Sequence, residues 1–247
     1  MMPPETSPTP RSAALVSVLA LMLIAAAGLT SCFSWQHDAE DLDPLQGKEL
    51  VVIVHGLGRT EASMIPLSHA LEEAGYEVLS WGYSSFCCRL ETIGQQLASE
   101  LERIEGPRPT KIHFVGHSFG NLVIRQLLTH TPPPEPGRVV MLAPPNQGST
   151  KADRWAPYFS WMLAPLDDLV TDPSGAAASL PPIRERAVGI IAGRYDGKVS
   201  IDETRMKGTD AHIVVPSAHT FIMADGQVHA LVLSFLETGV FEGATPE

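Results

Sequence analysis

Short apolar runs alternate along the chain with longer segments in which apolar residues recur every three or four positions. The first run, residues 50–54, is uninterrupted and rich in β-branched side chains, as is typical of a strand buried on both faces. Similar runs predict five further strands at residues 76–83, 111–116, 138–145, 187–193 and 211–216. Helical spacing predicts helices at residues 61–75, 91–104, 118–130 and 229–239.

Strands that alternate with helices predict a parallel sheet with helices on both faces, which is the α/β class. The alternation stops between residues 146 and 187, where no strand is predicted. Within this region, the segment 151–182 carries a wide apolar face that Pro157 and Pro165 interrupt. We therefore expect one domain at residues 47–247, with a helical insertion at 151–182 after the fourth strand.

The N-terminal segment differs from the rest of the chain. Residues 13–29 form an uncharged apolar run that is short for a membrane span and fits the central part of a secretory signal. The run leads into Thr30, Ser31 and Cys32, and this end resembles a bacterial lipobox, where a signal peptide is cut before a cysteine that is then acylated. The resemblance implies a signal peptide at residues 1–31, lipidation of Cys32 and a polar tether at 32–46. The alternatives are an uncleaved anchor helix and a plain signal peptide.

All these alternatives place the domain outside the cytoplasm and next to a membrane. The lipobox resemblance implies a lipid-anchored protein of the cell envelope that faces the periplasm. In lipoproteins of this kind an aspartate after the cysteine often signals retention in the inner membrane. Here Phe33 follows, which favours the outer membrane. The sequence does not indicate the oligomeric state.

Composition excludes some classes of function. The 247 residues are 44% hydrophobic, enough for the core of one sizeable domain. The formal net charge of −11 argues against a nucleic-acid partner, because such binding uses clustered Lys and Arg. No Asp, Glu or His has the spacing of a metal site, so we expect no metal or other cofactor. Cys87 and Cys88 are adjacent, which favours two packed side chains over a strained disulfide, although an oxidising compartment permits either.

Residues 115–120, VGHSFG, place Ser118 between two glycines. A predicted strand leads into this stretch and a predicted helix leaves it, which is the setting of a nucleophile elbow. Gly116 and Gly120 suit so tight a turn, because side chains there would clash with neighbouring elements. Open α/β sheets bind ligands at the carboxyl ends of their strands, where Ser118 lies. Ser118 is therefore the candidate nucleophile.

A serine hydroxyl needs a base and a group that orients the base. After a nucleophile elbow, the acid and then the histidine follow at the ends of later strands. Asp196 lies just beyond the fifth predicted strand and His219 just beyond the sixth. We therefore predict a catalytic triad of Ser118, Asp196 and His219. Asp202 and Asp172 are the rival acids.

An oxyanion hole needs backbone N–H donors close to the nucleophile. We predict that Phe119, directly after the serine, supplies one and that Leu57 supplies the other. Leu57 lies in the loop HGLGR, residues 55–59, where two glycines let the backbone turn inward. The remaining candidate histidines are interpreted as structural or surface residues: His55, His117, His212 and His229.

Five stretches, together with their order, resemble the α/β-hydrolase superfamily and specifically its lipase and serine-esterase branch. They are VVIVHGLGRT, IHFVGHSFGNLVIRQLL, VVMLAPPNQGS, IIAGRYDGKVS and AHTFIM. The resemblance covers residues 48–239, although the sheet begins at the strand that carries HG, so the first strands of larger members are missing. It implies a mostly parallel sheet flanked by helices.

The same resemblance implies a membrane-tethered serine hydrolase that cleaves lipid or other acyl esters through an acyl-enzyme. A thioesterase, an amidase or an acyltransferase would use the same triad. A lipid-binding lipoprotein without catalytic activity is the alternative from another class. The insertion is interpreted as a lid or as a wall of the acyl pocket, with Trp155, Phe159 and Met162 as substrate-binding residues. The alternative for this segment is a helical cover packed on the core.

Overall fold

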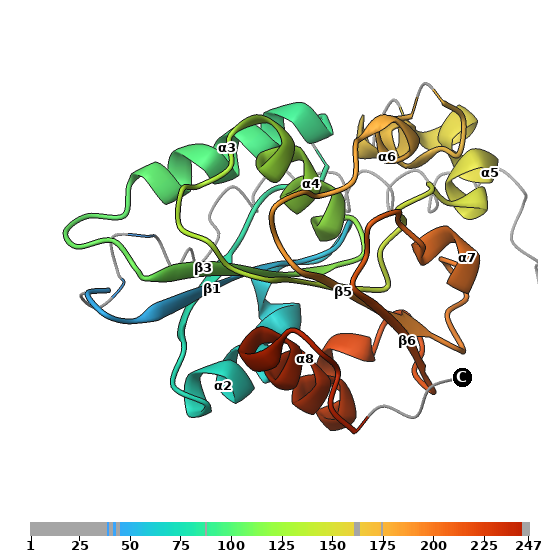
Figure 1. Cartoon of the computed structure of the whole chain (residues 1–247). Coiled ribbons are helices and arrows are strands. Elements are labelled where there is room, and N and C mark those ends of the chain that lie inside the picture. The colour runs from blue at the N-terminus through green and yellow to red at the C-terminus, as the bar shows by residue number, and fades with distance from the viewer. Residues whose placement is uncertain are drawn as a thin grey trace, which may run out of the picture. The chain divides into compact units, whose positions relative to one another are not determined.

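Six strands form one sheet in the computed structural model of the chain (Figure 1). They are β1 (Glu49–Val54), β2 (Glu77–Trp81), β3 (Lys111–His117), β4 (Val139–Leu142), β5 (Val188–Gly193) and β6 (Ala211–Val215). The order across the sheet is β2-β1-β3-β4-β5-β6, and every neighbouring pair is parallel. The predicted α/β class with a parallel sheet is confirmed, and all six expected strands are present.

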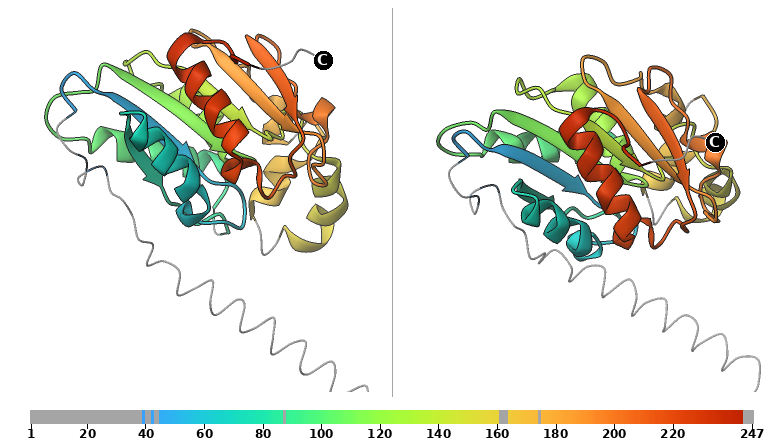
Figure 2. Two further views of the ribbon diagram at one scale, coloured as in Figure 1. Left: turned by 90° about the horizontal axis from the view of Figure 1, so that it is seen from below. Right: turned by 60° about the horizontal axis from the view of Figure 1, so that its bottom comes forward.

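Helices connect the strands and cover both faces of the sheet. The longer ones are α2 (Ile65–Glu73), α3 (Leu90–Glu102), α4 (Gly120–His130), α5 (Thr150–Phe159) and α8 (Gly226–Thr238). The short ones are η2 (Glu61–Met64), η3 (Ala164–Leu169), α6 (Ala176–Ser179), α7 (Ile201–Thr204) and η4 (Ile222–Ala224). Helices α3 and α4 lie on one face of the sheet, and α2 and α8 lie on the other (Figures 1 and 2).

The alternation of side chains along the strands divides the core into two layers. In β1, Leu50, Val52 and Val54 belong to the layer that includes α3 and α4. Val51 and Ile53 belong to the layer that includes α2 and α8. All five side chains are fully buried. This double burial explains why the strand is a continuous apolar run and does not alternate with polar residues.

The insertion after β4 consists of α5, η3 and α6, so the predicted helical insertion is present. The sequence-based prediction missed the one-turn helix α7, which follows β5. Its N-terminus is a capping box, in which Ser200 Oγ accepts from the Glu203 N–H and the Glu203 carboxylate accepts from the Ser200 N–H. The pattern Ser-x-x-Glu is the sequence signal that marks this helix start.

The structure describes residues 39, 42, 45–86, 88–160, 164–173 and 175–243, which all belong to one compact unit at 36–247. The predicted signal peptide, Cys32, Cys87, Met162 and the side chain of Phe159 lie outside the described part. No helix within the described ranges is long and apolar enough to span a membrane.

Candidate active site

Ser118 occupies the turn between β3 and α4 with φ 53°, in the left-handed region that side chains rarely adopt. A Cβ added at Gly120 would lie 2.3 Å from the Val54 carbonyl oxygen, and one at Gly116 would lie 2.4 Å from the Asn121 side chain. Both distances are too short for a non-bonded contact, so glycine lets the turn lie against β1 and α4. Strained backbone of this kind is often concentrated at functional sites.

Hydrogen bonds to β4 hold the strained turn in place. The Ser118 N–H donates to the Leu142 carbonyl oxygen at 2.9 Å. The side-chain amide of Asn121, which is fully buried, donates to the carbonyl oxygens of Ser118 at 3.0 Å and Leu142 at 3.1 Å. The backbone of the turn is thus fixed from both sides, and the direction of the Cα–Cβ bond of Ser118 is fixed with it.

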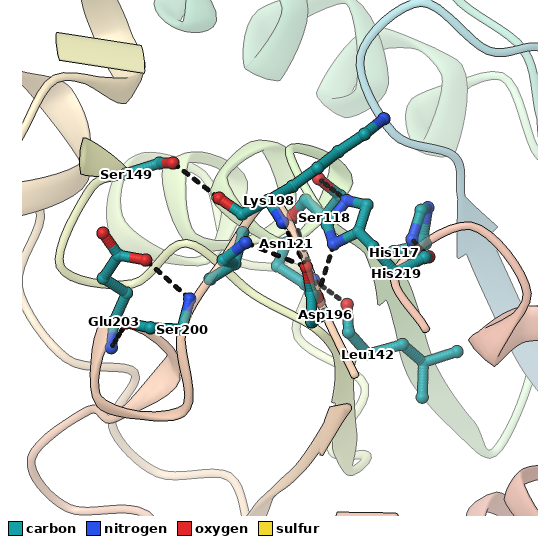
Figure 3. A network of polar contacts seen from close by, with 11 residues as sticks. His117, Ser118, Asn121, Leu142, Ser149, Asp196, Lys198, Ser200, Glu203 and His219 are labelled. Atoms are coloured by element: carbon teal, nitrogen blue, oxygen red, sulfur yellow. Dashed lines mark hydrogen bonds and ion pairs between the residues drawn. The ribbon is translucent and has the colours of Figure 1, made fainter. Parts of the chain in front are cut away.

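The structure brings Ser118, His219 and Asp196 into one hydrogen-bonded series (Figure 3). His219 Nε2 lies 3.0 Å from Ser118 Oγ, and His219 Nδ1 lies 2.6 Å from Asp196 Oδ2. A carboxylate only accepts, so Nδ1–H donates to Asp196 and Nε2 is left to accept the hydroxyl proton of Ser118. Ser118 lies in the turn after β3, Asp196 in the loop after β5 and His219 in the loop after β6. All three positions are at the carboxyl edge of the sheet.

The backbone after β5 holds the second oxygen of Asp196. Asp196 Oδ1 accepts from the N–H groups of Lys198 at 2.7 Å and Val199 at 2.9 Å. The Asp196 side chain is only 1% exposed. The rival Asp202 has a side chain that is 94% exposed and faces Arg205. Of these two carboxylates, Asp196 is therefore the one that orients His219.

His117 lies beside the triad and contacts the backbone of its histidine. His117 Nε2–H donates to the His219 carbonyl oxygen at 2.9 Å, and the two ring centroids are 4.9 Å apart. Burial lowers the pKa of His117 well below its ordinary value, so its imidazole is neutral near pH 7. The sequence-based expectation that His117 is structural agrees with this contact, which steadies the loop that carries His219.

A second histidine shapes the loop after β1. His55 Nδ1–H donates to the Gly56 carbonyl oxygen at 3.0 Å, and His55 stacks on Tyr83 with ring centroids 4.2 Å apart. The Tyr83 hydroxyl donates to the His55 carbonyl oxygen at 2.8 Å. These contacts fix the loop that carries Leu57, the expected oxyanion donor, which lines the cavity beside Ser118. Phe119, the other expected donor, is the N-cap residue of α4.

The serine opens onto a cavity of about 370 Å³. Its lining residues are Gly56, Leu57, Arg59, His117, Ser118, Pro145, Ser149, Lys151, Ala152, Trp155, Leu166, Leu169, Gly197, Lys198, Val199 and His219. Ala152 and Trp155 of α5 and Leu166 and Leu169 of η3 supply one wall. The insertion therefore borders the serine, as expected, and Trp155 lines the cavity, while its role in substrate binding stays a prediction. The Phe159 side chain and Met162, the other two predicted substrate-binding residues, lie outside the described part of the chain.

Buried polar contacts tie the insertion to the body of the domain. The Asp168 carboxylate of η3 accepts from the Leu90 N–H at 2.9 Å and pairs with Arg89 at 2.8 Å. Arg125 of α4, which is 2% exposed, donates to the carbonyl oxygens of Ala177 and Leu180 near α6. These anchors favour a fixed wall over a mobile lid.

Several residues of the cavity did not emerge from the sequence-based prediction. Arg59 directly follows the HGLG stretch, and Lys198 lies two residues after Asp196. Their closeness to these predicted site residues was a signal that could have found them. Lys151 and Leu169 carry no such signal, because only the path of the insertion brings them to the serine. Leu166 belongs to the apolar face of the insertion, which was expected to border the site.

Residues 45–141 match the sequence model of a family described as "Putative serine esterase (DUF676)". This match runs from β1 into β4 and includes Ser118, but Asp196 and His219 lie beyond it. No curated protein matches the chain in sequence.

Similar solved structures include two lipases and a hydrolase. The mature lipase BlEst2 of Bacillus licheniformis is 17% identical, with 80% of this chain and 94% of that chain covered and a TM-score of 0.62. A monoacylglycerol lipase of Paleococcus ferrophilus is 17% identical, with coverages of 78% and 95% and a TM-score of 0.55. A hydrolase from Oleispira antarctica is 15% identical, with coverages of 82% and 98% and a TM-score of 0.58. The chain therefore has the α/β-hydrolase fold of lipases and esterases, and the family match within that fold supports a carboxylic ester hydrolase.

Proposed function

We propose that the protein is a serine hydrolase that cleaves carboxylic esters of lipid or other acyl substrates through an acyl-enzyme. The observation that carries this proposal is the hydrogen-bonded series of Ser118, His219 and Asp196 at the mouth of a partly apolar cavity. A hydroxyl, a base and an orienting acid in this order are the parts that nucleophilic acyl transfer requires.

In the first step, Ser118 Oγ attacks the carbonyl carbon of the ester while His219 Nε2 takes the hydroxyl proton. Asp196 keeps the proton of His219 on Nδ1 and stabilises the imidazolium that forms. The imidazolium then gives its Nε2 proton to the departing alcohol, which leaves the acyl group on Ser118. Water then attacks the acyl-enzyme while the same Nε2 takes its proton. The imidazolium returns this proton to Ser118 Oγ as the acyl–oxygen bond breaks, which releases the carboxylic acid and restores the enzyme.

The negative charge that develops on the carbonyl oxygen needs fixed donors. The N–H groups of Leu57 and Phe119 supply them in this proposal, since Leu57 borders the cavity and Phe119 follows the nucleophile. Removing one such donor costs about 3 kcal/mol of transition-state stabilisation in related chemistry. The acyl chain lies against the wall made by α5 and η3, where Trp155, Leu166 and Leu169 offer apolar surface.

The proposal includes a membrane tether. Residues 29–32 and the apolar run before them support a lipid anchor at Cys32 in the cell envelope, on the periplasmic side, with the outer membrane preferred. A tether of this kind would hold the hydrolase next to acyl lipids.

A fluorophosphonate probe tests the assignment, because it forms a covalent bond with an activated serine. We expect labelling of the wild-type protein, none of Ser118→Ala, and full labelling of the control Ser179→Ala in α6. Hydrolysis of p-nitrophenyl esters of graded chain length then measures the acyl preference. A folded wild-type protein that takes up no probe and cleaves no ester would support a lipid-binding lipoprotein instead.

A further inference from the structure

Three cationic side chains line the same cavity as Ser118. Arg59 lies in the loop after β1, Lys151 in the first turn of α5 and Lys198 in the loop after β5. No Asp or Glu is among the described residues that line this cavity. Three separate segments therefore bring positive charge to one site in a chain whose formal net charge is −11.

Within the described ranges, none of the three cations forms an ion pair with a carboxylate. Three carboxylates of adjacent segments make other contacts. Asp196 accepts from the backbone N–H groups of Lys198 and Val199 and contacts His219. Glu203 accepts from the N–H groups of Thr150 and Ser200, and Asp153 accepts from Thr171.

Two of the cations act electrostatically on His117, the residue next to the nucleophile. Burial is the main cause of the low pKa of His117, and the positive charges of Arg59 and Lys198 lower it further. His117 directly precedes Ser118, so both charges reach the neighbourhood of the nucleophile. Figure 3 shows the extended side chain of Lys198 in the same close view as Ser118 and His219.

Like charges that meet at one cavity repel one another, and the repulsion rises as a substrate displaces water. A neutral ester would leave this repulsion in place. An ester with an anionic group would reduce it, and the positive potential would also raise the rate of its encounter with the site. The three cations therefore favour an anionic ester over a neutral ester as the substrate.

We infer that the preferred substrates of the proposed esterase are acyl esters that carry an anionic group, a phosphate or a carboxylate, close to the scissile bond. This inference rests on the proposed function. The anion lies among Arg59, Lys151 and Lys198 while the ester carbonyl meets Ser118 Oγ. The planar guanidinium of Arg59 suits two oxygens of either anion, whereas the lysines act as point charges.

Two pairs of soluble esters test the inference, each with an anionic member and a neutral member of similar size. The phosphate pair is 1-hexanoyl-glycerol-3-phosphate and 1-hexanoyl-glycerol. The carboxylate pair is mono-p-nitrophenyl glutarate and p-nitrophenyl pentanoate. We expect kcat/KM of the wild-type protein to favour the anionic member by at least about tenfold in one pair. The pair with the larger ratio identifies the kind of anion.

The triple variant Arg59→Gln, Lys151→Gln, Lys198→Gln should bring this ratio close to one. The control Lys207→Gln, an exposed lysine between α7 and β6 that does not line the cavity, should keep the wild-type ratio. In the wild-type protein the ratio should also fall as salt rises from about 0.02 M to about 0.5 M, because ions screen the attraction. The salt series decides the question even if the triple variant does not fold.

A wild-type ratio of one or less in both pairs, a ratio that does not change with salt, or an unchanged ratio in the folded triple variant would overturn the inference while leaving the esterase proposal intact. If neither member of either pair is hydrolysed and no fluorophosphonate labels Ser118, the esterase proposal itself fails, and this inference fails with it.

Discussion

The two oxygens of Asp196 have different partners, and this division assigns its role. Oδ2 contacts His219, while Oδ1 accepts from the backbone of Lys198 and Val199. The backbone contacts fix the carboxylate whether or not the imidazole is present. The Asp196 carboxylate is therefore positioned to orient His219, whereas the exposed side chain of Asp202 is not.

Replacing Asp196 by Asn should lower kcat by about 10³- to 10⁴-fold, because an amide no longer holds the proton on His219 Nδ1. The side chain keeps its shape, so the melting temperature should change little. Steady-state kinetics and thermal melts measure both effects. Asp202→Asn is the matched control and should behave as wild type. If Asp202→Asn is the damaging change and Asp196→Asn is mild, the acid is misassigned.

At the level of elements, α5 and η3 form both a cover for the core and a wall of the cavity. Leu166 and Leu169 are buried in the core cluster and also border the cavity. Trp155, on α5, borders the cavity but is 49% exposed. Leu166 and Leu169 therefore serve both the core and the cavity wall, whereas Trp155 contributes mainly to the cavity wall.

Trp155→Ala should reduce kcat/KM for long-chain p-nitrophenyl esters at least about tenfold more than for the acetate, since an acyl chain loses apolar contact. The control is Tyr158→Ala on the same helix, which is 69% exposed and does not line the cavity. It should leave the ratio of long-chain to acetate activity unchanged. Equal losses on both esters together with a lower melting temperature would show that Trp155 serves packing.

At the level of the whole molecule, buried neutral histidines make the folded state sensitive to acid. Burial, which outweighs the opposing effect of Glu49, lowers the pKa of His113 to about 4. The pKa of a histidine in the unfolded chain is about 6.5. Between these values the unfolded chain binds a proton that the folded protein does not. The contribution of neutral His113 to the free energy of unfolding is therefore complete above a pH of about 6.5, and it is lost as the pH falls towards 4.

We expect the unfolding free energy of the wild-type protein to fall by about 2 kcal/mol more than that of His113→Asn between pH 7 and pH 5. Urea unfolding at the two pH values measures this difference. His130→Asn, at the exposed end of α4, is the control and should keep the wild-type pH dependence. Parallel pH dependences for wild type and His113→Asn would contradict the prediction.

The proposed lipid anchor also concerns the molecule as a whole. Mass spectrometry of the mature protein should find a chain that starts at an acylated Cys32, and Cys32→Ser should move the protein from the membrane fraction to the soluble fraction. An unmodified Cys32, or retention of residues 1–31, would refute the lipoprotein interpretation. The domain at 47–247 should stay catalytically active whether or not Cys32 is acylated.

The succession of strands and helices, the elbow and the positions of Ser118, Asp196 and His219 could be predicted from the sequence, whereas the order of the strands across the sheet was not predicted. Apolar periodicity and the two glycines act over a few residues, and parallel strands bring their carboxyl ends to one edge. Folding in three dimensions decided which residues surround the serine. Lys151 and Leu169 line one cavity with Lys198 and Ser118 because of loop paths and contacts such as those of Arg125. These contacts join segments far apart in the chain, and no local pattern of apolar and polar residues records them.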